Sequence, residues 1–283
     1  MVAQPFNWEQ KVVEDYRQRI IVDADNPILA FKSSRDRYAG LLGQQKYAGL
    51  PHLGSSRSED ALTWNLFRSL QKAGKLGVVS SELHIGQPRG LLLWALAPQV
   101  DSTNAELQYV TGALLRKFDG IFRGQMTEPD VVLLGTKGIA VFECKLSERG
   151  EAPTHLWEGK LDSVRKRCPV YRGELPCLIK EEVSDEEVAP VYQLVRLSFY
   201  AVKLGASYHV EPVLVSLANR TNWLLQIRKL QKSPSELWET FCIEMLGGTS
   251  PRCKNLTWQD LAEKIRGTSL VTLSTYLSTH PCL

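Results

Sequence analysis

The sequence predicts an α/β fold, in which a central mixed β-sheet is flanked by helices, with a helical arm before it and a helical tail after it. Three observations carry this prediction. Periodic apolar residues indicate helices at 59–73 and 190–204. Two apolar runs around a glycine-containing loop indicate a hairpin, and a third run at 209–217 indicates a further strand. Helices and strands in this order are typical of a mixed sheet covered by helices.

Composition excludes several classes of protein. The chain has 283 residues, of which 43% are hydrophobic and 23% charged, as in soluble globular proteins. Its longest apolar run, 90–98, is too short to span a bilayer, and the first ten residues lack the apolar stretch of a signal peptide. We therefore expect a cytoplasmic protein with no membrane partner. The six cysteines form no CxxC pair and are expected to be free thiols.

The chain has no internal repeat, and its composition suggests three parts. Residues 1–58 form an N-terminal arm, with a helix expected at 7–20 and then a stretch rich in Gly and Ser. Residues 59–218 hold the alternating helices and strands and form the expected core. Residues 219–283 are expected to be a mainly helical extension of the same domain.

Local signals place the elements of this core. The helix at 59–73 begins after Ser58, a good N-cap, and ends at Gly74. Residues 78–97 are interpreted as extended, and 104–117 as helical.

The second half of the core begins with the hairpin strands, at 129–134 and 139–146. A loop-rich segment of basic and then acidic residues follows at 148–188, before the helix at 190–204 and the last strand.

The hairpin brings two carboxylates together. A symmetric four-residue loop places Asp130 directly opposite Glu143, with Cβ atoms about 4.5–5.5 Å apart. The same register pairs Val132 with Val141 in apolar contact behind them. Because side chains alternate along a strand, Lys145 lies on the face of Glu143.

This group of residues suits metal-assisted hydrolysis. Two like charges held opposite each other destabilise a sheet unless something compensates them. Mg²⁺ is the natural compensation, because it prefers oxygen ligands and is usually held by one or two carboxylates with water and phosphate; Mn²⁺ is the expected substitute. A lysine beside them can orient an attacking water or neutralise a phosphate in the transition state.

The pattern Pro129-Asp130, then Glu143-Cys144-Lys145, resembles the PD-(D/E)xK nuclease superfamily, which has the restriction-endonuclease-like fold. Residues 138–145 also resemble the nuclease-related (NERD) branch. The resemblance covers about the middle half of the chain. It implies a Mg²⁺-dependent nuclease in which Asp130, Glu143 and the backbone carbonyl of Cys144 bind the metal, while Lys145 acts on the attacking water.

The resemblance further implies an acidic ligand from the first core helix, and Glu59 is the candidate. On a helical projection, Glu59 lies within the apolar face that carries Leu62, Leu66 and Leu70. A carboxylate that faces a core needs a partner, which a metal or Lys145 would provide. The alternative is a first-turn Glu that simply interacts with the helix dipole.

Two basic stretches are candidates for nucleic-acid contact. One is a polar stripe on the helix at 190–204, for which an ordinary solvated face is the alternative. It consists of Gln193, Arg196, Tyr200 and Lys203. The other is a basic cluster in the segment after the hairpin, for which a role in solubility is the alternative. It includes Lys160, Arg165, Lys166 and Arg167.

The leading hypothesis is a Mg²⁺-dependent DNA nuclease that acts in restriction, defence or repair. DNA is the expected partner, RNA stays open, and a homodimer is possible because restriction enzymes of this superfamily often dimerise to cut both strands. Two alternatives remain: a nucleic-acid-binding protein of the same fold that no longer cleaves, and an α/β interaction protein without nuclease activity.

Overall fold

The computed structural model describes residues 8, 13, 15–32, 53, 58–119, 128–145, 154–218, 238–266 and 268–280, with side chains in 154–160 excepted. The chain divides into two compact units, and each is described by itself. The first unit joins residues 1–79 to 257–283, and the second contains residues 80–256. The predicted hairpin belongs to the second unit.

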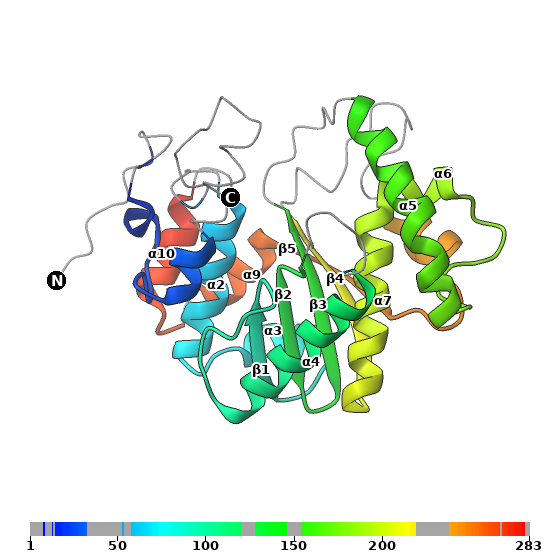
Figure 1. Ribbon diagram of the computed structural model, residues 1–283. Helices are drawn as coiled ribbons and strands as arrows, with labels where there is room; N and C mark the ends of the chain where they lie inside the picture. The colour runs from blue at the N-terminus through cyan, green and yellow to red at the C-terminus, as the bar shows by residue number, and fades with distance from the viewer. Residues whose placement is uncertain are drawn as a thin grey trace. The chain divides into compact units, whose positions relative to one another are not determined.

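A five-stranded sheet with the order β1-β2-β3-β4-β5 is the centre of the second unit (Figure 1). Its strands are β1 (Pro88–Leu93), β2 (Val131–Gly135), β3 (Gly138–Lys145), β4 (Glu211–Ala218) and β5 (Arg252–Thr257). β2 runs antiparallel to both β1 and β3, whereas β4 runs parallel to β3. The sheet is therefore mixed, and the predicted fold class is confirmed: an α/β protein consistent with a restriction-endonuclease-like core.

The hairpin has the predicted register. Val132 pairs with Val141 and Leu134 with Ile139. The turn between the strands requires glycine at Gly135, because a Cβ there would collide with the backbone carbonyl of Ile85. No bulge shifts the pairing between β2 and β3. The start of β2 therefore lies opposite the end of β3.

Two helices, α4 (Ser102–Phe118) and α7 (Tyr192–Tyr208), pack against the strands of the sheet. The other helical elements are α3 (Gly77–Glu82), α5 (Thr154–Glu174) and α6 (Asp185–Val188), with a 3-10 turn at Ala189–Val191 and a π-helix at Thr240–Met245. Figure 1 shows α4 and α7 on one face of the sheet. Their apolar residues pack into one core with alternate residues of the strands, including Val132, Val141 and Leu214. The sheet face that carries the predicted carboxylates is thus the face that α7 covers.

Three elements differ from the sequence-based prediction. Much of the segment expected to be loop-rich is the helix α5, whose pattern is weakened by Pro169 and by many charges. Residues 77–82 form the short helix α3 instead of an extended segment. The tail contributes β5, whose mostly polar sequence lacks the alternation of a half-buried strand because it adds to the edge beside β4.

The first unit is built from helices. These are the 3-10 turn η1 (Tyr16–Arg19), a helical segment at 27–32, α2 (Glu59–Lys72), α9 (Trp258–Ile265) and α10 (Val271–Thr279). Ser58 caps α2 by accepting a hydrogen bond from the amide of Ala61, as predicted. Of the helix expected at 7–20, the described residues show only the turn η1. Asn65 on α2 connects this helix to the turn η1, because its side-chain amide donates a hydrogen bond to the carbonyl of Arg19.

Acid is expected to weaken the first unit through His280. This side chain is buried against the rings of Trp8 and Tyr276, and burial lowers its pKa to about 4. The unfolded chain, with a pKa of about 6.5, therefore binds a proton that the folded unit excludes, and stability falls as the pH drops from about 6.5 towards 4. Between pH 7 and pH 4.5 we expect a loss of about 2 kcal/mol from this residue.

Urea unfolding of the wild type and of His280→Phe at both pH values measures this loss. Phe keeps an aromatic ring in the stack and cannot titrate. The difference in unfolding free energy between the two proteins should change by about 2 kcal/mol between the two pH values. The same difference at both would contradict a neutral, buried His280.

Candidate active site at the ends of two neighbouring strands

The two predicted carboxylates lie at neighbouring strand ends. Asp130 directly precedes β2, and the register of the hairpin places it opposite Glu143 on β3. The Oδ2 atom of Asp130 accepts a hydrogen bond of 2.8 Å from the backbone amide of Cys144. The side chain of Asp130 is therefore fastened to the strand that carries Glu143.

Glu143 is a buried carboxylate that forms an ion pair with Lys145. Its side chain is 1% exposed, and its Oε1 atom lies 2.9 Å from Nζ of Lys145. Lys145 keeps 17% of its side chain exposed. The ion pair compensates the charge of Glu143, yet Oε1 accepts no hydrogen bond of good geometry from the residues that the structure describes.

Gln193 supplies the other contact of Glu143. Its Nε2 atom donates a hydrogen bond of 2.8 Å to Oε2 of Glu143. Gln193 lies in the first turn of α7, so the positive end of the helix dipole also favours a negative charge there. Predicted as a nucleic-acid contact, Gln193 is placed by the structure against the candidate catalytic carboxylate.

Ser216 is a neighbour of Glu143 that the sequence analysis missed. It is in register with Glu143 across the parallel pair of β3 and β4. Its side chain is fully buried, and its hydroxyl has no hydrogen-bond partner among the described residues. The available signal was a lone polar residue in the apolar run from Val213 to Ala218.

Two further residues of the predicted stripe on α7, Arg196 and Tyr200, face the interior of the protein. Arg196 is 2% exposed, and its Nε atom lies 2.9 Å from Oδ2 of the fully buried Asp119. Tyr200 is also buried, and burial raises its pKa far above the usual range. These two residues therefore do not belong to a solvated face, and Arg196 is held in a buried ion pair. Their contact with nucleic acid stays a prediction.

The end of the stripe is likewise paired within the protein. Lys203 donates a hydrogen bond of 2.8 Å to Glu174, which is the last residue of α5. Arg167 on α5 lies 3.5 Å from Oδ1 of Asp119, and Tyr171 donates a hydrogen bond of 2.9 Å to the same oxygen. The helices α5 and α7 therefore meet around the carboxylate of Asp119. Asp119 is the C-cap residue of α4, where its backbone amide donates to the carbonyl of Leu115.

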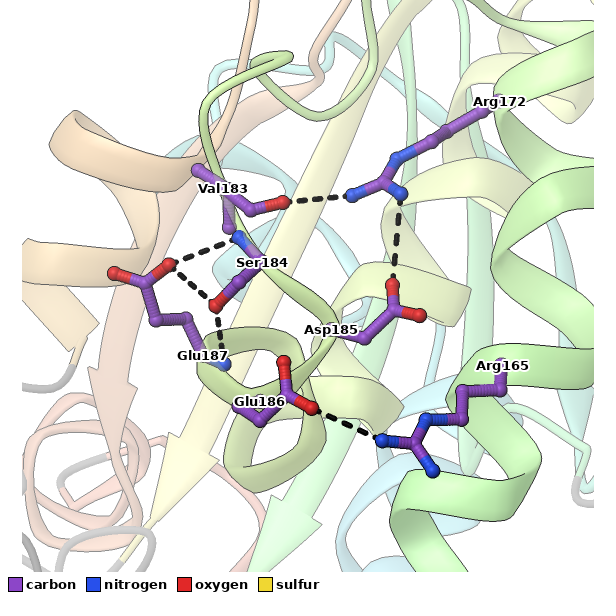
Figure 2. A network of polar contacts seen from close by, with 7 residues as sticks. All are labelled: Arg165, Arg172, Val183, Ser184, Asp185, Glu186 and Glu187. Carbon is purple, nitrogen blue, oxygen red and sulfur yellow. Dashed lines mark hydrogen bonds and ion pairs between the residues drawn. The ribbon is translucent and has the colours of Figure 1, made fainter.

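Much of the basic cluster on α5 faces acidic residues of its own chain (Figure 2). Arg165 lies 3.1 Å from Glu186, and Arg172 lies 3.5 Å from Asp185. Ser184 and Glu187 form a capping box that starts α6 and orders these acids.

Lys166 and Lys160 are the other two residues of the cluster that were predicted to contact nucleic acid. Lys166 is exposed. Lys160 lies in α5, but its side chain is outside the described residues. Because Arg165 and Arg167 both have acidic partners, the cluster is less free to bind phosphates than its composition suggests.

Glu59 is the first residue of α2 and belongs to the first unit. Its side chain is partly buried, while Leu62, Leu66 and Leu70 of the predicted apolar face are buried. Because Asp130 and Glu143 belong to the second unit, the assignment of Glu59 as a third metal ligand stays a prediction.

If Glu59 is such a ligand, Glu59→Ala weakens Mn²⁺ binding by at least about tenfold without unfolding the protein. Asp60→Ala is the matched control, because Asp60 is also an acid of the first helical turn and is paired with Lys32. Titration with Mn²⁺ followed by electron paramagnetic resonance measures both variants. Equal affinities would contradict the assignment of Glu59 as a metal ligand.

Two carboxylates are the acidic groups of this site. Among the described residues, no group of three or more Cys, His, Asp or Glu side chains is arranged to hold a metal ion. Mg²⁺ does not need such a cage, since it usually retains water and takes one or two carboxylates. The carboxylates of Asp130 and Glu143, at neighbouring strand ends, fit that requirement. None of the described helices is long and apolar enough to cross a membrane.

Comparison with known proteins identifies the family. Residues 45–280 match the model of a family described as "Restriction Endonuclease associating with ARP". No curated protein and no solved structure matches the chain significantly. The family match spans most of the chain and includes the hairpin, α7 and the sheet. The chain therefore belongs to the family of restriction endonucleases associating with ARP, within the restriction-endonuclease-like superfamily.

Proposed function

We propose that this protein is a Mg²⁺-dependent deoxyribonuclease that hydrolyses phosphodiester bonds by the chemistry of the PD-(D/E)xK enzymes. The observation that carries the proposal is the placement of Asp130, Glu143 and Lys145 at the ends of β2 and β3 in a chain of a restriction endonuclease family. A restriction or defence setting suits this family best.

The donor set suits a hard cation. Asp130, Glu143 and the backbone carbonyl of Cys144 would hold Mg²⁺, and Mn²⁺ has the same preference for oxygen. When bound, such a cation polarises the phosphate and lowers the pKa of a bound water. The amide of Cys144 fixes Asp130, and Gln193 fixes Glu143, so both carboxylates are held in place before any ligand arrives.

Lys145 has the position of a group that acts on the reaction. Its ammonium lies against Glu143 and is partly exposed, so it can reach both the buried carboxylate and a phosphate from outside. There it would orient the attacking water and offset the negative charge that develops on the phosphate. Burial of Glu143 strengthens these electrostatic effects, because water screens them less.

The test is incubation of circular and linear DNA with the purified protein in Mg²⁺, in Mn²⁺ and in EDTA. We expect cleavage of DNA in both metals and none in EDTA. Asp130→Asn should abolish cleavage at equal folding, as judged by circular dichroism. Cleavage of the circle alone or of both forms distinguishes endonuclease from exonuclease action.

Other results would replace the proposal. Cleavage of single- or double-stranded RNA instead of DNA would change the substrate class. DNA binding without cleavage in either metal would indicate a nucleic-acid-binding protein of the same fold. Neither binding nor cleavage would favour an interaction protein without nuclease activity.

A further inference from the structure

Ser216 lies beside the candidate catalytic carboxylate on a neighbouring strand. In the parallel register of β3 and β4, Ser216 is the partner of Glu143, so both side chains leave the same face of the sheet. Two residues earlier on each strand, and on the same face, Val141 and its partner Leu214 pack in the core under α7. Ser216 therefore continues an apolar column and ends it with a hydroxyl at the site.

Both polar groups in this position are buried and incompletely satisfied. The hydroxyl of Ser216 is fully buried and has no hydrogen-bond partner among the described residues. The buried Oε1 atom of Glu143 has the ion pair with Lys145, but it accepts no hydrogen bond of good geometry from the described residues. A buried polar group left without a hydrogen bond destabilises the folded protein. A hydroxyl without a partner, in register with a carboxylate that can accept a further hydrogen bond, indicates a small polar occupant between them, most simply a water molecule.

We propose that Ser216 is a positioning residue of this site, where its hydroxyl and Oε1 of Glu143 hold one water molecule between them. The hydroxyl of Ser216 donates to the water, and the water donates to Glu143. This leaves one lone pair of the water free, and Lys145 remains the charge partner of Glu143.

The role of that water rests on the proposed nuclease function. Held in this way, it is the nucleophile. Its oxygen forms the new bond to phosphorus, and one of its protons passes to solvent. The P–O3′ bond breaks, and its electron pair leaves with the 3′ oxygen, which takes a proton from solvent.

The chain provides a matched control in Ser198. Ser198 is also fully buried, and its hydroxyl likewise has no partner among the described residues. It lies on α7, five residues after Gln193 and therefore about 140° around the helix from it. Replacing Ser198 by Ala removes an equivalent buried oxygen from a different face of the helix.

Steady-state cleavage of DNA by Ser216→Ala and Ser198→Ala tests the role in catalysis. We expect Ser216→Ala to lower kcat by about 10- to 100-fold, because positioning of the nucleophile is lost. KM and the Kd for Mn²⁺ should stay within about twofold, since binding is not affected. Ser198→Ala should cleave like the wild type, and Ser216→Thr, which keeps the hydroxyl, should recover most of the rate. Equal kcat for the wild type and Ser216→Ala would overturn the role.

A high-resolution crystal structure of the metal-free protein tests the water site without any reaction. We expect one water within hydrogen-bond distance of Ser216 Oγ and Glu143 Oε1, and its loss in Ser216→Ala. A direct hydrogen bond between the two side chains, or a Ser216 hydroxyl bonded to a backbone carbonyl, would overturn the proposal. If the water is present but the wild type cleaves no nucleic acid, the proposed function fails and the water site stands.

Discussion

Lys145→Ala is expected to lose DNA cleavage by a factor on the order of 10²–10³ in kcat. The ammonium of Lys145 lies 2.9 Å from Oε1 of Glu143, and the Lys145 side chain is 17% exposed, so it can act on the attacking water and on the developing charge of the phosphate. That interaction is used mainly in the transition state. Metal and DNA binding should therefore stay largely intact while the rate falls.

Single-turnover cleavage, with equal folding checked by circular dichroism, measures this effect. Lys145→Arg should not rescue the rate, because a planar guanidinium fork has a different reach and cannot act as a compact point charge. Lys137→Ala is the matched control, since Lys137 is an exposed lysine in the turn of the same hairpin. Cleavage at wild-type speed by Lys145→Ala would remove the catalytic role, even if Asp130 and Glu143 hold a metal.

The sequence predicted the hairpin well because local rules decide it. Strand alternation and the length of the loop fix which residues face one another, and the pairs of Val132 with Val141 and of Leu134 with Ile139 are the predicted ones. The opposition of Asp130 and Glu143 follows from that register. Spacing alone was therefore sufficient to bring together the two carboxylates and Lys145.

The contacts from α7 could not be predicted in the same way. A helical projection correctly placed Gln193, Arg196 and Tyr200 on one stripe, but it cannot tell whether a polar stripe faces water or the protein. Here Arg196 forms an ion pair with Asp119, which lies more than seventy residues earlier, and Gln193 donates a hydrogen bond to Glu143. The partners of a buried polar stripe come from tertiary packing, which the sequence pattern does not encode locally.

Ser216 was missed for a related reason. A serine in an apolar strand is common, and its meaning depends on which residue of the adjacent parallel strand it faces. Parallel strands are joined through a long crossover, here containing α5, α6 and α7, so no turn fixes their register. The helix α5 in this crossover was not predicted, because a segment rich in charges resembles a solvated loop in composition. In the structure, charges such as Arg165 and Glu186 are paired.

The stability of the second unit is expected to depend strongly on Asp119. This carboxylate is fully buried, lies 2.9 Å from Arg196 and accepts a hydrogen bond from Tyr171. Asp119→Ala would leave the guanidinium of Arg196, itself 2% exposed, without its compensating charge. Breaking a buried ion pair from one side typically costs about 3–5 kcal/mol, which is a large share of the total stability of a domain.

Urea unfolding of Asp119→Ala, followed by circular dichroism, should show a loss of about 3–5 kcal/mol. The double variant Asp119→Leu with Arg196→Met removes both charges and should recover most of that loss, because desolvation of an ion pair offsets much of its Coulomb attraction. Arg165→Ala breaks the exposed pair with Glu186 (Figure 2) and should cost less than about 1 kcal/mol. If Asp119→Ala costs no more than Arg165→Ala, the charge of Arg196 is compensated by other groups, and the carboxylate of Asp119 does not hold α4 and α7 together.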